Sequence, residues 1–153
     1  MNSKISFELL WWCITAIVVI LIMLPIYLSI GEAFPFYKDN ILLIIIGVTF
    51  MRYIFLLKYH WLTFSNYIKA VFIIISIPVF FFLVGAFYDY QSYYDDGNFS
   101  ALLQDLHIEK QKSVLLYIRT EMIFFWAFAF ISNFILPFRM LISIWRKINK
   151  GTE

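Results

Sequence analysis

The chain has 153 residues, of which 63% are hydrophobic and 14% are charged, and its formal net charge is +2. Because a soluble domain keeps about a quarter of its residues charged, this composition excludes a soluble globular protein and places much of the chain in lipid. The low net charge gives no sign of a nucleic-acid partner. The single cysteine, Cys13, excludes an intrachain disulfide and any metal or redox chemistry built on cysteine pairs.

Four apolar segments follow one another along the chain, and a helix needs about 20 such residues to cross a bilayer. The predicted spans lie at about 9–30, 41–60, 67–88 and 116–138. The sequence therefore predicts an all-α integral membrane protein, a bundle of four transmembrane helices in one membrane domain over residues 1–153.

The second span carries a charged residue, Arg52. If the helix enters the hydrocarbon near Ile41, Arg52 lies about 16 Å deep, where an unpaired arginine costs ~3 kcal/mol or more. Its side chain should therefore face the bundle. Ser132 and Asn133 of the fourth span lie at a similar depth and Thr49 lies one turn away, so these four residues form a candidate intramembrane polar site, with a direct contact between Arg52 and Asn133.

Arg52 has two interpretations. It could form an anion or headgroup site or a gate, or it could be a structural residue that reaches toward the surface or joins two helices, and we favour the structural role. Glu8, just ahead of the first span, is expected at the membrane rim, where a solvated ion pair contributes little.

Residues 89–113 form the one sizeable polar segment. Residues 95–98 predict a turn, and from Ser100 onward leucines alternate with polar residues as in a short amphipathic helix on the outer surface of the membrane. Asp105 and Glu109 are four residues apart and should share one face of that helix, so both are outer-face acidic candidates.

The third acidic candidate is Glu121, at the outer end of the fourth span, where we expect an interfacial pair with Arg119. We expect neither a metal site nor a cofactor. His107 should point away from the face that carries the acidic pair, and His60 is predicted on the opposite side of the membrane.

Residues 139–153 form a basic tail. Because four spans place both termini on one side, that side should hold Lys4, Lys58, Lys69, Arg139, Arg146, Lys147 and Lys150, against Lys38, Lys110, Lys112 and Arg119 on the other. Cytoplasmic loops carry an excess of Lys and Arg. We therefore predict a plasma (inner) membrane protein with both termini in the cytoplasm.

The sequence has no Gly-x-Ser-x-Gly, no paired intramembrane aspartates, no His-Glu-x-x-His and no phosphate-binding loop. We therefore expect a non-enzymatic multi-pass membrane protein, an accessory or assembly subunit whose partners are the lipid bilayer and another membrane protein or itself. Two alternatives stay open. One is a small oligomeric channel or transporter with a polar path around Arg52, and the other is a lipid-modifying enzyme that uses the acidic outer segment with Glu121.

Overall fold

The computed structural model describes residues 3–60 and 65–150 of the chain, and no strand occurs in these ranges. The long helices are α1 (Ser3–Ile30), α2 (Tyr37–Leu56), α3 (Asn66–Asp95) and α5 (Ile108–Lys150), and the short elements are η1 (Gly31–Ala33), η2 (Leu57–Tyr59) and α4 (Asn98–Leu102). Among the described residues, four helices are long and apolar enough to cross a membrane. The predicted all-α membrane helical bundle is confirmed.

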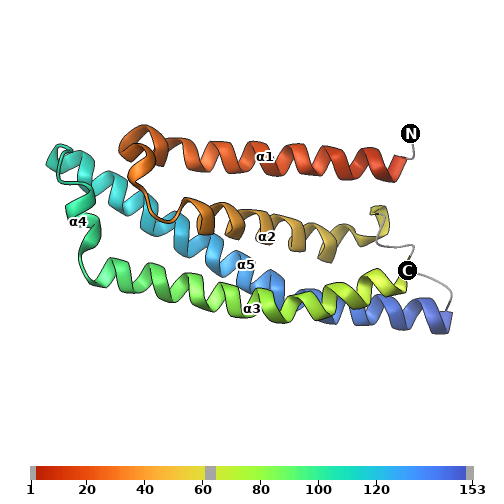
Figure 1. Cartoon of the computed structure of the whole chain (residues 1–153). Coiled ribbons are helices and arrows are strands. Elements are labelled where there is room, and N and C mark those ends of the chain that lie inside the picture. Colours follow the sequence, from red (N-terminus) through yellow and green to blue (C-terminus); the bar gives the residue numbers. More distant parts are fainter. Residues whose placement is uncertain (1–2, 61–64, 151–153) are drawn as a thin grey trace.

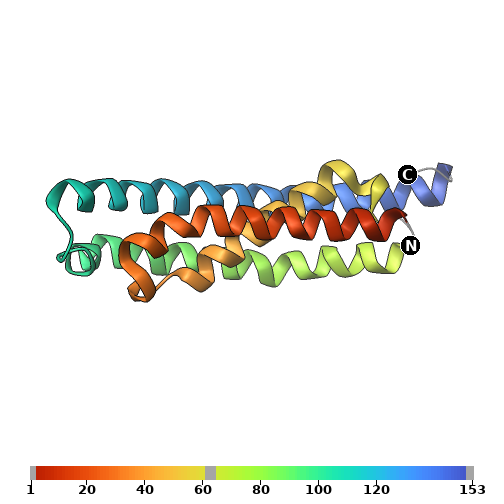
Figure 2. The same ribbon diagram turned by 90° about the horizontal axis from the view of Figure 1, so that it is seen from above.

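The four long helices run side by side (Figure 1). The start of α1, the end of α2, the start of α3 and the end of α5 gather at one end of the bundle, which we call the terminal end. The opposite end, which we call the connector end, carries η1 and α4. In Figure 2, α2 runs obliquely to the other three helices.

Helix α5 is the central element, because it packs against both α2 and α3, whereas α1 packs mainly against α2. In the most apolar part of α2, half of the residues are buried inside the bundle. In the most apolar parts of α1 and α3, only 17% of the residues are buried. Helices α1 and α3 therefore present most of their apolar surface to the surroundings of the bundle.

The buried face of α5 explains its central place. Buried side chains recur along it at intervals of three and four residues, which is the spacing of one helix face: Val114, Ile118, Glu121, Met122, Phe125, Ala129, Ser132, Asn133, Leu136, Met140 and Ser143. The face is apolar for most of its length, with polar side chains at three levels. Each of these levels meets a different part of α2 or α3.

Gly47 allows α2 and α5 to approach closely. A Cβ atom built on Gly47 would lie 2.5 Å from Cδ1 of Phe128 on α5. Only a residue without a side chain fits there unless the phenyl ring moves.

The connector end differs from the sequence prediction. Helix α3 continues to Asp95, past its predicted end near residue 88, because nothing breaks the helix before Gly97, whose φ of +72° favours glycine. The predicted amphipathic helix is reduced to the five residues of α4. Asp105 lies in the turn that follows, and Glu109 lies in the first turn of α5, so the prediction that these two share one helix face is wrong.

The terminal end shows how the predicted basic tail is arranged. The described part of this segment, residues 139–150, continues α5 as one helix with Pro137 inside it. Helix α1 likewise begins at Ser3, ahead of the predicted span. Glu8 is therefore a helical residue and not a flanking one.

Candidate functional site

A buried polar cluster joins α1 to α2 at the terminal end. Nη2 of Arg52 lies 3.0 Å from Oε2 of Glu8, and Nδ1 of His60 lies 2.7 Å from Oε1 of the same carboxylate. Arg52 is 3% exposed, Glu8 is 8% exposed and His60 is 0% exposed. We call these three residues the Glu8 cluster.

Aromatic rings surround the Glu8 cluster. The guanidinium carbon of Arg52 lies 5.1 Å from the centre of the Trp12 ring and 4.8 Å from that of Tyr53, within the range of cation–π attraction. Nη2 of Arg52 also donates to the Tyr53 hydroxyl at 3.1 Å. The ring of His60 packs against Phe7 and Tyr53, each at 5.1 Å between centroids. These rings keep water from the ion pair and strengthen it.

The charges of the cluster balance. His60 lies just past the membrane-spanning segment Tyr37–Tyr59, which ends one residue before the predicted span 41–60. Burial lowers the pKa of its imidazole and the nearby Arg52 lowers it further, while the hydrogen bond to Glu8 opposes the change. A neutral His60 with its proton on Nδ1 donates to Glu8, because a carboxylate only accepts. One carboxylate then faces one guanidinium, and no net charge remains buried.

The predicted contact between Arg52 and Asn133 is wrong. The partner of Arg52 is Glu8, whereas Nδ2 of Asn133 donates to the backbone oxygen of Ser76 on α3 at 3.1 Å. Helix α2 begins at Tyr37 and not near Ile41, so Arg52 lies about one turn from its terminal end, closer to that surface than expected.

The other two intramembrane candidates do not join Arg52 either. Ser132 is fully buried on α5, and its hydroxyl has no hydrogen-bond partner within the described residues. The Thr49 hydroxyl on α2 is also without one. The structure therefore separates the predicted site into the Glu8 cluster and a contact between α3 and α5.

Glu121 is buried inside the bundle near the connector end. Its Oε2 accepts a hydrogen bond from Nδ2 of Asn40 on α2 at 2.7 Å, and the two residues are 6% and 0% exposed. The expected pair with Arg119 is wrong, since Arg119 is exposed and lies over the ring of Tyr94, 5.2 Å from its centre. Glu121 faces α2 because it occupies the buried stripe of α5.

The outer-face acidic candidates are therefore not gathered into one site. Asp105 and Glu109 are exposed, whereas Glu121 is buried. No group of three or more metal-ligating side chains occurs among the described residues.

A further polar contact joins α3 and α5 at the terminal end. Lys69 is 0% exposed, and its Nζ donates to the Ser143 hydroxyl at 2.9 Å. Nε of Arg139 donates to the backbone oxygen of Ile54 at 3.0 Å. The sequence analysis places both cations on the side of the termini, and in the structure each also connects two helices.

No protein-family model, curated protein or solved structure matches this chain.

Proposed function

We propose that this chain is a non-enzymatic multi-pass membrane subunit that acts by packing its exposed helix surface against a different membrane protein. The observation that carries the proposal is the placement of α1. This helix packs mainly against α2, and the rest of its surface is lined by exposed apolar side chains: Leu9, Leu10, Ile14, Ile17, Ile20, Leu21, Leu24 and Leu28.

The use of the polar side chains supports the same proposal. Glu8 with Arg52, Asn40 with Glu121, and Lys69 with Ser143 each join two helices of the bundle. Catalysis needs a nucleophile or an acid–base pair that can reach a substrate, and a channel needs a continuous polar lining. Side chains that hold helices together supply neither.

The two alternatives have less support. A polar path around Arg52 would need Thr49, Ser132 and Asn133 beside it, and Asn133 bonds to α3 instead. A lipid-modifying enzyme would need Glu121 beside the outer acidic residues, and Glu121 is buried against Asn40.

We also propose that both termini are cytoplasmic and that the membrane is the plasma (inner) membrane. Lys58, Lys69, Arg139, Arg146 and Lys147 belong to the terminal end, whereas most acidic residues belong to the connector end. This distribution supports the orientation because positive residues stay on the cytoplasmic side.

Photo-crosslinking within native membranes tests the subunit proposal. A crosslinking residue at Leu21 or Leu28, which are 62% and 71% exposed, should trap one protein partner in a fixed ratio. The same residue at Ile26, 0% exposed on the same helix, is the matched control and should trap none. A particle that purifies alone in mild detergent, with lipid adducts only, would contradict the proposal. Adducts between identical copies would favour the channel alternative.

A further inference from the structure

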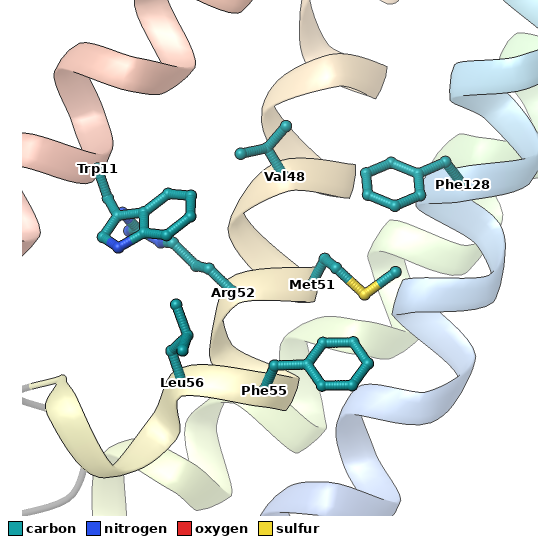
Figure 3. Close-up of a pocket in the computed structure, with 7 residues that line it drawn as sticks. All are labelled: Trp11, Val48, Met51, Arg52, Phe55, Leu56 and Phe128. Atoms are coloured by element: carbon teal, nitrogen blue, oxygen red, sulfur yellow. The ribbon is translucent and has the colours of Figure 1, made fainter.

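Among the described residues, two acidic side chains are buried, and only one of them, Glu8, has a counter-charge. Figure 3 shows the side chain of Arg52 reaching from α2 toward α1, where its Nη2 lies 3.0 Å from the Glu8 carboxylate. The second buried acid is Glu121 on α5. No lysine, arginine or histidine of the described chain forms an ion pair with it, and its hydrogen-bond partner is the amide of Asn40.

The surroundings of Glu121 and Asn40 are apolar. Ile118 and Phe125 lie about one turn away from Glu121 along α5, and Leu43 lies about one turn away from Asn40 along α2. All three belong to the same buried hydrophobic cluster. An ionised carboxylate in such surroundings, without a counter-charge, is so costly that the group takes up a proton instead.

The titratable groups of the neighbouring helices do not supply the missing charge. Tyr90 of α3 is close enough to Glu121 to interact with it electrostatically, but a tyrosine hydroxyl is uncharged at neutral pH. On α5 itself, the Tyr117 hydroxyl donates to the backbone of α1 at 2.9 Å, and Arg119 is exposed. Helix α1 has no charged residue in the half nearer the connector end. The remaining acidic, basic and histidine side chains toward that end are exposed, apart from the half-buried Asp39: Glu32, Lys38, Asp89, Asp95, Asp96, Asp105, His107, Glu109, Lys110 and Lys112.

The hydrogen bonds of the pair are complementary to one bound proton. Nδ2 of Asn40 donates to Oε2 of Glu121 at 2.7 Å, while Oε1 of Glu121 and Oδ1 of Asn40 are buried without a partner within ranges 3–60 and 65–150. The described residues that border the gaps in these ranges lie at the terminal end, away from the pair. Amide and carboxylate oxygens only accept hydrogen bonds, whereas a protonated carboxyl group donates one. A proton on Oε1 therefore gives both oxygens a partner.

We propose that Glu121 and Asn40 form a buried proton-binding site, in which Glu121 keeps its proton under conditions where exposed carboxyl groups are ionised. The proton comes from water, is bound to Oε1 of Glu121 and is donated to Oδ1 of Asn40, and no other bond changes. The acid and the amide are then joined by two hydrogen bonds. Asn40 lies about one turn from the start of α2, so the site makes the contact between α2 and α5 depend on the pH at the connector end. The site does not depend on the proposed protein partner.

Infrared spectroscopy of the purified full chain tests this site, because a protonated carboxyl group and an ionised carboxylate absorb at different frequencies. At pH 6 the exposed carboxyl groups, whose ordinary pKa values are about 4, are ionised, so we expect one carboxylic acid band. Glu121→Gln should remove this band. Glu109→Gln, at an exposed residue of the same helix, is the matched control and should retain it. Asn40→Leu should keep the band but shift it to higher frequency, because the acid loses both hydrogen bonds.

Detergent unfolding of Glu121→Gln at pH 6 is the second measurement. The new amide donates to Oδ1 of Asn40 and accepts from its Nδ2, as the protonated acid does, so the unfolding midpoint should equal that of the unchanged protein. A rise in this midpoint would mean that a buried charge had been removed, and it would overturn the proposal.

Four infrared results would also overturn the proposal. They are the absence of an acid band at pH 6, a band that persists in Glu121→Gln, an unshifted band in Asn40→Leu, and loss of the band when sodium chloride is added at constant pH. The last result would make a metal cation the occupant of the site. If Asn40→Leu does not fold, the two measurements on Glu121→Gln still decide the proposal.

Discussion

The carboxylate of Glu8 contacts two side chains, one at the terminal end of α2 and one in the residues that follow α2. Each oxygen has its own partner, Arg52 on one side and His60 on the other. Among the described residues α1 packs mainly against α2, and this carboxylate links the two helices through polar contacts. The cluster therefore fixes α1 at the end where its helix begins.

We expect Glu8→Gln to reduce the free energy of unfolding by about 3 kcal/mol. The substitution leaves the buried guanidinium of Arg52 without a counter-charge, and breaking a buried ion pair from one side costs about 3–5 kcal/mol. Unfolding by denaturing detergent measures the change. Glu32→Gln, at an exposed residue of η1, is the matched control. The double variant Glu8→Gln/Arg52→Gln should recover part of the loss, and a double variant no better than the single one would contradict this account.

The contribution of His60 to the stability of the protein should fall when the pH drops below about 6.5, the ordinary pKa of histidine. Burial lowers the pKa of His60 in the folded protein. The unfolded chain therefore binds a proton at a pH where the folded chain does not. The stabilisation is complete above the ordinary pKa and is lost as the pH falls toward the lowered value, by at most about 1.4 kcal/mol per pH unit.

Unfolding curves between pH 7.5 and 5.5 check this dependence. His60→Asn keeps a donor near Glu8 but does not titrate, so the part of the pH dependence that His60 supplies should be missing from this variant. His107, the second histidine of the chain, is exposed near the connector end, and His107→Asn should retain the full pH dependence. A similar dependence in His60→Asn would assign it to other groups.

The partner of Arg52 could have been identified from the sequence. The sequence places only Glu8 and Glu153 on the side of both termini, and Glu8 directly precedes the first span, so Glu8 was the nearer candidate for an arginine toward that end. A buried charge needs a counter-charge more than it needs an amide, which favours Glu8 over Asn133. The sequence does not identify the partners of Lys69 and Glu121 in this way. These partners are Ser143 and Asn40, respectively, and nothing in the sequence distinguishes either of them from an ordinary surface residue.

The approach of α2 to α5 depends on Gly47. Alanine is the better helix former by about 1 kcal/mol, but overpacking costs about 1–3 kcal/mol, and the new Cβ would press on the Phe128 ring. We therefore expect Gly47→Ala to destabilise the protein by about 1 kcal/mol.

Gly85 provides the matched control for this substitution. It lies in α3, and a Cβ built there meets nothing within 4 Å. Gly85→Ala should be neutral or stabilising by up to ~1 kcal/mol. Detergent unfolding compares the two variants, and Gly47→Ala/Phe128→Leu should recover stability if the ring is the cause. Equal effects of the two alanines would show that the contact with Phe128 is unimportant.

The sequence identifies the long helices because hydropathy alone defines them, and it fails where helices end or meet. The continuation of α3 to Asp95 and the shortness of α4 depend on the conformation of Gly97 and on packing, neither of which hydropathy measures. The sequence also does not show which helices pack against α5. Each span is apolar on all sides, and in lipid an exposed leucine is as favourable as a buried one.

The orientation of the protein in the membrane can be measured directly. In a Cys13→Ser background, we expect Ser100→Cys to react with a membrane-impermeant maleimide added to intact cells. Ile148→Cys should react only after lysis. Both positions are exposed, at opposite ends of the bundle, so each serves as the control for the other. The reverse labelling pattern would place the terminal end outside the cytoplasm.

The length of the helices has a consequence for the membrane itself. The helical stretch from Ile5 to Ala33 has 29 residues and α3 has 30, so each is about 43–45 Å long. A typical bilayer has about 30 Å of hydrocarbon and about 40–45 Å with its headgroup layers, so both helices are long enough to reach from one headgroup layer to the other. In a thinner bilayer they would tilt or thicken the surrounding lipid, at a cost that grows with the mismatch. Bilayer thickness is therefore a physical variable that affects the stability of this protein.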